Sequence, residues 1–152
     1  MGCANGRDAK EILKRTKNYI GVDGAKKLLE IAINENPNGN FQLLDFRDLE
    51  FEENSYDIVI DFDSLFHFDK RDLKKMLEKI HKWLDINGFF MMYAKFGDYQ
   101  KIINNQQQGK VQYLYKPRDI VMLAENKFKL ISQETIDRFN KKWFTIILQK
   151  NG

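Results

Sequence analysis

The chain opens with a turn of small residues that directly precedes an amphipathic helix. Gly2, Ala4 and Gly6 alternate with larger residues, and the apolar residues of segment 8–17 recur with helical spacing. A backbone without bulky side chains can pass close beneath a ligand, and a helix N-terminus offers unpaired N–H groups and positive dipole charge. The pattern predicts a cofactor cradle, and an ordinary tight turn is the competing interpretation.

Three predicted strands each end in an aspartate. The apolar runs 19–23, 41–45 and 56–61 finish at Asp23, Asp45 and Asp61. The carboxyl ends of parallel strands meet at one edge of a sheet, so we expect these carboxylates to share that edge. Asp23 comes about twenty residues after the turn, where an acid can bind both hydroxyls of a ribose. Capping of the following helix is the alternative role for Asp23.

Helices and strands alternate along most of the chain. We expect helices at 8–17, 25–36, the segment that Asp69 caps, and 116–126, and a further strand at 89–95. Runs 128–135 and 143–149 indicate a closing antiparallel pair joined by 136–142. The pattern breaks over 96–115, which contains the polar run 104–109, and this indicates a loop that is either a lid or slack. This order predicts a single α/β domain over residues 1–152, with a mostly parallel sheet and helices on both faces.

Composition excludes several classes of function. The 25 Lys and Arg nearly balance the 22 Asp and Glu, and a net charge of +3 does not indicate nucleic-acid binding. One cysteine, Cys3, permits neither an internal disulfide framework nor a structural zinc site, so we expect no metal and a cytoplasmic protein. No apolar run is long enough to cross a bilayer, and the first residues do not resemble a signal peptide.

Several motifs together resemble one family, the class I (Rossmann-like) S-adenosylmethionine-dependent methyltransferases. Residues 2–8, Gly-Cys-Ala-Asn-Gly-Arg-Asp, are similar to that family's Gly-Cys-Gly-Thr-Gly-Arg-Asp motif, and residues 55–59, Ser-Tyr-Asp-Ile-Val, to its Ser-Phe-Asp-Leu-Val. Residues 64–67, Ser-Leu-Phe-His, are similar to Ser-Leu-His-His. Within the family, small bacterial-type methyltransferase-domain proteins resemble the chain best. A nicotinamide-dependent reductase is disfavoured, because its loop would place a small residue where Arg7 stands.

The resemblance implies S-adenosylmethionine as cofactor and S-adenosylhomocysteine as product. The cofactor-binding residues that it implies are Gly2, Cys3, Ala4, Asn5, Gly6, Arg7, Asp23, Gly24, Asp45, Phe46, Asp61 and Phe62. His67 is the candidate catalytic base, although a packed histidine is the alternative. The candidate substrate residues are Asp63, His67, Tyr113, Tyr115 and Trp143, and for the aromatic ones a place in the core is the alternative.

Two departures from the family pattern matter. The chain starts one residue before Gly2, so the resemblance implies that strand one is missing, either through N-terminal truncation or because another segment or subunit fills the gap. Ala4 adds a methyl group where the family has glycine. We therefore expect a methyltransferase that acts on a small-molecule or unidentified acceptor, without nucleic-acid or membrane partners. A non-catalytic or partner-dependent S-adenosylmethionine-binding relative is the alternative, with a homo-oligomer or second chain covering the missing strand.

Overall fold

The structure, a computed structural model, describes residues 1–104 and 109–152. It divides into two compact units, unit 1 (Met1–Glu50) and unit 2 (Phe51–Gly152). Each unit is described by itself below. The expectation of a single domain stays a prediction.

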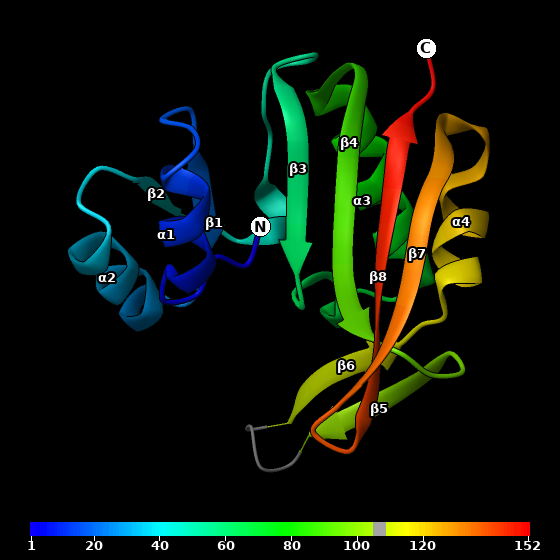
Figure 1. Ribbon diagram of the computed structural model, residues 1–152. Helices are drawn as coiled ribbons and strands as arrows, with labels where there is room; N and C mark the ends of the chain where they lie inside the picture. Colours follow the sequence, from blue (N-terminus) through cyan, green and yellow to red (C-terminus); the bar gives the residue numbers. More distant parts are fainter. Residues whose placement is uncertain (105–108) are drawn as a thin grey trace. The chain divides into compact units, whose positions relative to one another are not determined.

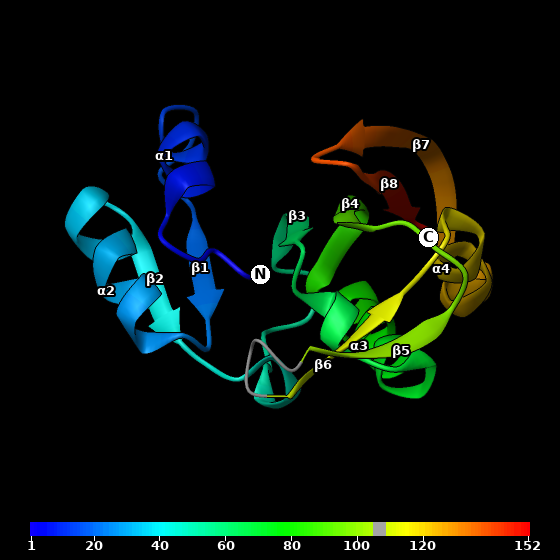
Figure 2. The same ribbon diagram turned by 90° about the horizontal axis from the view of Figure 1, so that it is seen from below.

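Unit 1 is a small parallel α/β layer. Its elements are α1 (Arg7–Leu13), β1 (Ile20–Asp23), α2 (Lys26–Glu35), β2 (Asn40–Leu43) and the 3-10 turn η1 (Phe46–Asp48). β1 and β2 pair in parallel from Ile20 opposite Asn40 to Asp23 opposite Leu43. α2 packs along both strands (Figure 2) and buries Leu29 and Ala32. α1 ends four residues before the predicted boundary at position 17.

Unit 2 is built on a four-stranded sheet in the order β3-β4-β8-β7. β3 pairs with β4 in parallel, and β8 and β7 follow in antiparallel pairing. α3 and α4 both lie behind this sheet in Figure 1. The elements are β3 (Tyr56–Phe62), η2 (Leu65–His67), α3 (Lys70–Trp83), β4 (Leu84–Lys95), β5 (Gln100–Asn104), β6 (Lys110–Leu114), α4 (Pro117–Ala124), η4 (Glu125–Lys127), β7 (Phe128–Arg138) and β8 (Lys141–Lys150).

The core of unit 2 lies between the sheet and its two helices. Alternate residues of the central strands face the helices, because successive side chains of a strand point to opposite faces. The buried strand residues are Phe90, Met92, Ala94, Phe144, Ile146 and Leu148, and α3 contributes Leu73, Met76, Leu77, Ile80 and Trp83. Asp69 caps α3 as predicted, since its carboxylate accepts the backbone N–H of Asp72 at 2.9 Å.

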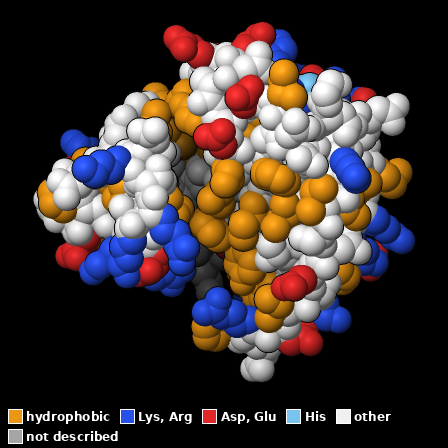
Figure 3. Space-filling view, turned by 45° about the horizontal axis from the view of Figure 1, so that its top comes forward, with side chains coloured by type: hydrophobic (Ala, Val, Ile, Leu, Met, Phe, Trp, Pro, Cys, Tyr) orange, Lys and Arg blue, Asp and Glu red, His pale blue; other side chains and the backbone are white. Residues whose placement is uncertain are grey.

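The opposite face of the same sheet is apolar as well. Figure 3 shows hydrophobic side chains gathered over it. Ile58 of β3 is 57% exposed, and its partner on β4, Phe89, is 36% exposed. Among the described residues β3 pairs with β4 alone and β1 with β2 alone, so the strand that the resemblance places between β1 and β3 is not among the described strands.

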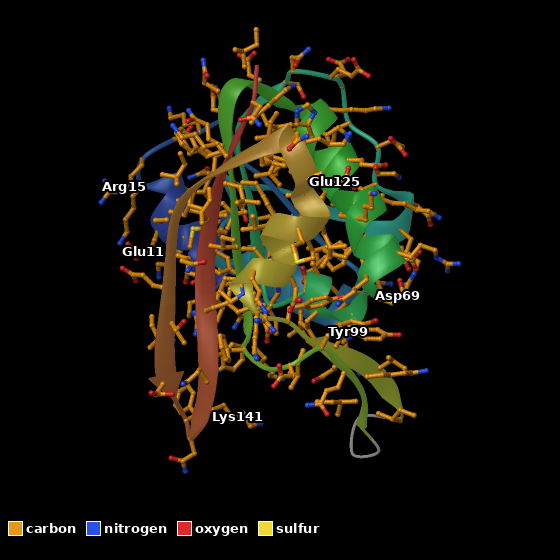
Figure 4. All side chains as sticks on the ribbon, turned by 90° about the vertical axis from the view of Figure 1, so that its right-hand side faces the viewer. Glu11, Arg15, Asp69, Tyr99, Glu125 and Lys141 are labelled. Carbon is orange, nitrogen blue, oxygen red and sulfur yellow. The ribbon has the colours of Figure 1, made fainter. Side chains whose placement is uncertain are left out.

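The expectation of an irregular loop over 96–115 is wrong for most of that stretch. β5 and β6 form an antiparallel hairpin, from Gln100 opposite Leu114 to Asn104 opposite Lys110. Tyr99 stacks on Tyr113 with ring centroids 5.9 Å apart, and Figure 4 shows Tyr99 at the same end of α3 as Asp69. The polar run that suggested a loop starts only at the hairpin's far end, and residues 105–108 lie outside the described residues.

The connection predicted at 136–142 is also wrong. β7 and β8 continue almost to the tip of their hairpin, and only Phe139 and Asn140 connect them. Both residues have positive φ values, 52° and 57°, which suits a two-residue turn between twisted strands. Among the helices of the described residues, none combines the length and apolar character needed to cross a bilayer.

Candidate functional site

The turn at the start of unit 1 has the shape of a cradle. Three of its residues have left-handed backbones, with φ of 66° at Gly2, 45° at Ala4 and 78° at Gly6. The N–H of Cys3 donates to the carbonyl of Val22 at 3.2 Å, which fixes the turn to the end of β1. Ala4, which stands where the family has glycine, thus adopts a left-handed backbone conformation that glycine adopts more readily.

Gly6 sits where no side chain fits. A Cβ atom at this position would lie 2.6 Å from Asn36 Nδ2 and 2.9 Å from Ala32 Cβ. The amide of Asn36 is itself fixed, because it donates to the carbonyls of Gly6 at 3.2 Å and Ala32 at 3.1 Å. Close packing of α2 against the turn therefore explains this glycine.

Asp23 ties the turn to the start of the next helix. One carboxylate oxygen accepts the N–H of Ala4 at 2.8 Å, and the other accepts the N–H of Ala25 at 2.8 Å. A carboxylate has about four acceptor positions, so each oxygen can accept one more hydrogen bond. The bond to Ala25 reaches the residue before α2, and α2 has no side-chain cap hydrogen bond, so the capping interpretation is not satisfied. The bond to Ala4 places the acid at the glycine turn, as the cofactor interpretation requires.

The remaining candidates of unit 1 lie at its surface. Asp45 Oδ1 accepts the N–H of Arg47 at 2.8 Å and so shapes the turn η1, which begins with Phe46. Asp45 follows β2 by two residues, so the expectation that it ends its strand is wrong. Asn5, Arg7 and Gly24 are exposed. The predicted cofactor contacts of these five residues stay predictions.

The surroundings of the Cys3 thiol do not favour a nucleophilic role. Burial, followed by the nearby Asp23 carboxylate, raises the pKa of the Cys3 thiol to about 11. The thiol is therefore protonated at neutral pH, and a thiol reacts as its thiolate. The predicted cofactor contact of Cys3 therefore does not depend on a thiolate, and it stays a prediction.

In unit 2, Asp61 and Asp63 have different surroundings although only one residue separates them. Asp61 is fully buried, and its carboxylate accepts hydrogen bonds from Ser64 Oγ and, at 3.2 Å, from the N–H of Leu65. Burial raises the pKa of Asp61. Its carboxylate positions η2, and its predicted cofactor contact, like that of neighbouring Phe62, stays a prediction.

Asp63, directly after β3, has a buried carboxylate oxygen whose hydrogen-bonding capacity is not used within the described residues. Its Oδ1 atom is buried and has no hydrogen-bond partner among the described residues, while its N–H donates to the carbonyl of Tyr93 at 2.8 Å. Its φ of 52° is unusual for a residue with a side chain. Burial raises the pKa of Asp63 to about 6, and the Lys95 ammonium offsets part of that rise.

We expect the substitution Asp63→Asn to stabilise unit 2 over the wild type, and to do so more at pH 7 than at pH 4. The folded protein holds this proton more tightly than the unfolded chain, so the Asp63 carboxylate lowers stability progressively as pH rises from about 4 to about 6. Removing the charge should raise the free energy of unfolding by about 2 kcal/mol at pH 7 and change it little at pH 4. Urea unfolding followed by fluorescence measures this, since both tryptophans, Trp83 and Trp143, lie in unit 2. An equal effect at both pH values, or an equal gain in the exposed control Asp57→Asn, would contradict the assignment.

His67 is oriented by a backbone carbonyl. Its Nδ1 donates to the carbonyl of Val111 on β6 at 2.7 Å, and its ring lies 4.1 Å from the ring of Phe66. With the proton on Nδ1, the neutral ring carries its lone pair on Nε2. The histidine thus packs as the structural alternative proposed, and it also presents the tautomer of a base.

The three aromatic candidates divide into structural and surface positions. Tyr115 is fully buried and its hydroxyl donates to the carbonyl of Phe68 at 2.6 Å, which is a core role. Tyr113 stacks on Tyr99, and Trp143 stacks on Tyr93 with ring centroids 5.0 Å apart. The expectation that Tyr113, Tyr115 and Trp143 contact substrate stays a prediction.

Sequence reasoning did not single out Lys95 and Gln112. The Lys95 ammonium lies 3.2 Å from Gln112 Oε1, 5.1 Å from the centre of the Phe66 ring and 5.5 Å from that of Trp143. A lysine that ends a continuous apolar strand was a usable signal, because it falls at the edge where the other candidates lie. Gln112 gave no signal, because its strand was not predicted. Within the described chain, no cluster of three His, Cys, Asp or Glu side chains could hold a metal ion.

The comparisons with known proteins agree with the motifs. A family model described as a methyltransferase domain matches residues 1–88, more than half of the chain. A carboxy-S-adenosyl-L-methionine synthase of Staphylococcus epidermidis is 28% identical over 86 residues, and the match covers 55% of this chain and 37% of that protein. The chain therefore spans little more than a third of this curated relative's length.

Solved structures show the same fold. A 1,6-didemethyltoxoflavin-N1-methyltransferase of Burkholderia thailandensis, with S-adenosylhomocysteine bound, matches with a TM-score of 0.83 at 17% identity over 99% of this chain and 69% of its own. A Clostridium acetobutylicum S-adenosylmethionine-dependent methyltransferase matches with a TM-score of 0.79 at 14% identity over 99% and 82%. These likenesses confirm the expected fold, and with the family match they show that the chain belongs to the class I S-adenosylmethionine-dependent methyltransferase-domain family.

Proposed function

We propose that this chain binds S-adenosylmethionine through unit 1 and transfers its methyl group to a small-molecule acceptor. The observation that carries the proposal is Asp23, whose two carboxylate oxygens are fixed by the N–H groups of Ala4 and Ala25 at the glycine turn. A carboxylate fixed in this way can receive the two hydroxyls of a ribose without reorganising. Membership of the family supplies the identity of the cofactor.

The residues around Asp23 fit the other parts of the cofactor. Gly2 and Gly6 have no side chain and Ala4 has only a methyl group, so little bulk surrounds the backbone of the turn at these positions. Asp45 and Phe46 follow β2, where the resemblance implies contact with adenine. The cofactor supplies an activated methyl group on a sulfonium, so the protein's own contribution is largely alignment and removal of a proton.

Isothermal titration with S-adenosylhomocysteine tests this proposal. We expect saturable binding at one site per chain, and NADH should not compete for it. Binding together with methyl transfer to some acceptor supports the enzyme, and binding without transfer across an acceptor screen supports the non-catalytic alternative. If the folded chain does not bind the compound in the millimolar range, the proposal is wrong.

His67 is the proposed general base of unit 2. Its Nδ1 bond to the carbonyl of Val111 leaves Nε2 as the proton acceptor of the neutral ring. We expect His67→Asn to lower the transfer rate about 100-fold or more while S-adenosylhomocysteine binding is unchanged, because the asparagine amide can still donate to Val111. The control His67→Gln places its amide where Nε2 was. If either variant keeps the wild-type rate, His67 is only structural.

The open edge of β3 and the apolar face of its sheet favour binding of a partner chain to unit 2. β3 pairs on one side only among the described strands, and Ile58 exposes an apolar side chain next to that edge. Open strand edges and exposed apolar faces favour association. We infer a homo-oligomer or a second chain on this side of unit 2, in a cytoplasmic protein. A sedimentation mass that stays monomeric at high concentration, and on addition of cell extract, would refute this inference.

A further inference from the structure

Lys95 presents a fixed positive charge at the carboxyl end of β4. Its ammonium has three N–H donors, and Gln112 Oε1 accepts one of them at 3.2 Å. The faces of Phe66 and Trp143, at 5.1 Å and 5.5 Å, hold the same cation by cation–π attraction. A lysine held on three sides loses little further freedom when it binds an anion.

Asp63 presents the opposite charge at the end of the neighbouring strand. Its carboxylate has a buried oxygen that finds no partner in the part of the chain that the structure describes, and its backbone adopts a left-handed conformation. Both features lower the stability of unit 2, and such features concentrate at ligand sites. A ligand that brings an N–H donor or a positive charge to this carboxylate would remove the cost.

The two charges do not neutralise each other directly. No ion pair within 4.0 Å joins Asp63 to Lys95 among the described residues, yet the ammonium is close enough to lower the pKa of the carboxyl. A cation fixed by one set of contacts and an anion with a vacant acceptor therefore stand at the same sheet edge. Their complement is a molecule with a carboxylate and an amine.

We propose that the methyl acceptor is a small zwitterion, whose carboxylate binds Lys95 and whose amine binds Asp63 and receives the methyl group. This inference rests on the proposed function. The ammonium of the acceptor first loses a proton to His67, which passes it to solvent. The nitrogen lone pair then forms the N–C bond as the C–S bond of the sulfonium breaks and its electrons return to sulfur. The positive charge moves from sulfur to nitrogen, so charge and atoms balance.

Two matched sets of compounds test the inference. One contains 4-(aminomethyl)benzoate, benzoate and benzylamine, and the other β-alanine, propionate and propylamine. Each compound is titrated into the whole chain with and without S-adenosylhomocysteine. In at least one set we expect the zwitterion to bind about tenfold or more tightly than either one-charge relative, since both charged hydrogen bonds contribute. If neither set shows this preference, the inference is wrong.

Two variants that each remove one charge test which residue binds the carboxylate of the zwitterion and which binds its amine. Lys95→Met should weaken the carboxylate compounds about tenfold and leave benzylamine unchanged, and Asp63→Asn should weaken the amines and leave benzoate unchanged. Lys129→Met and Asp137→Asn, at exposed positions of β7, are matched controls that should change nothing. Equal weakening of all compounds would show a merely structural role and overturn the assignment. S-adenosylhomocysteine binding without zwitterion preference refutes only this inference. A zwitterion preference without S-adenosylhomocysteine binding refutes the proposed function, and with it the role of the zwitterion as methyl acceptor.

Discussion

Asp23→Ala is expected to weaken binding of S-adenosylhomocysteine about 100-fold to 10,000-fold. Hydrogen bonds to a charged group each contribute about 1.5–3 kcal/mol, and the proposed contact with the ribose makes two of them. The variant also frees the N–H groups of Ala4 and Ala25, which the carboxylate now holds at 2.8 Å. Affinity should therefore fall through both lost contacts and lost order in the turn. Isothermal titration measures the change.

A second variant separates these two causes. Asp23→Asn keeps the size of the side chain and one oxygen acceptor, so it should retain more of the turn while losing the charge; we expect about a 100-fold loss. Glu30→Gln, at an exposed position of α2, removes a charge from the same unit and should bind normally. Wild-type affinity in folded Asp23→Asn would limit Asp23 to its hydrogen bonds with the backbone of Ala4 and Ala25 and remove the main support for the cofactor site.

The glycine turn of unit 1 and the place of Asp23 beside it could be predicted because the information that determines them is local. The turn, the strand after it and Asp23 lie within one short stretch, where residue type and spacing determine geometry. A small residue at position 6 suggested a tight turn, and the structure adds the reason, which is the approach of Asn36 from the end of α2. That reason involves a contact thirty positions away and is not visible in a local pattern.

The surroundings of the candidate residues in unit 2 could be predicted only in part, because burial and strand pairing decide them. Asp61 and Asp63 both appeared as acids after a strand, but only the structure shows that Asp61 is occupied by its own turn and Asp63 is not. The hairpin of β5 and β6 was missed because a polar composition concealed its pairing. Without that hairpin, neither the Val111 partner of His67 nor the Gln112 partner of Lys95 could be predicted.

Gly6→Ala is expected to destabilise unit 1 by about 2–4 kcal/mol and to weaken S-adenosylhomocysteine binding with it. A left-handed alanine costs about 1 kcal/mol, and forcing a methyl group into packed surroundings costs about 1–3 kcal/mol more. The new Cβ would lie 2.6 Å from Asn36 Nδ2 and 3.0 Å from the backbone Cα of Ala32. Neither atom can move cheaply, because the Asn36 amide is bonded to two carbonyls and Ala32 is inside a helix.

Two other glycines divide this effect into its parts. Gly109 has a φ of 73°, and a methyl group added there would meet no atom of the described residues within 4 Å, so Gly109→Ala measures chiefly the backbone cost. Gly24 has no positive φ and its nearest atom would be the carbonyl oxygen of Leu44 at 3.7 Å, so Gly24→Ala should be almost neutral. Urea unfolding followed by circular dichroism compares the three variants. If Gly6→Ala costs no more than Gly109→Ala, α2 yields to the methyl group, and the turn is held less tightly than the contacts of Asn36 indicate.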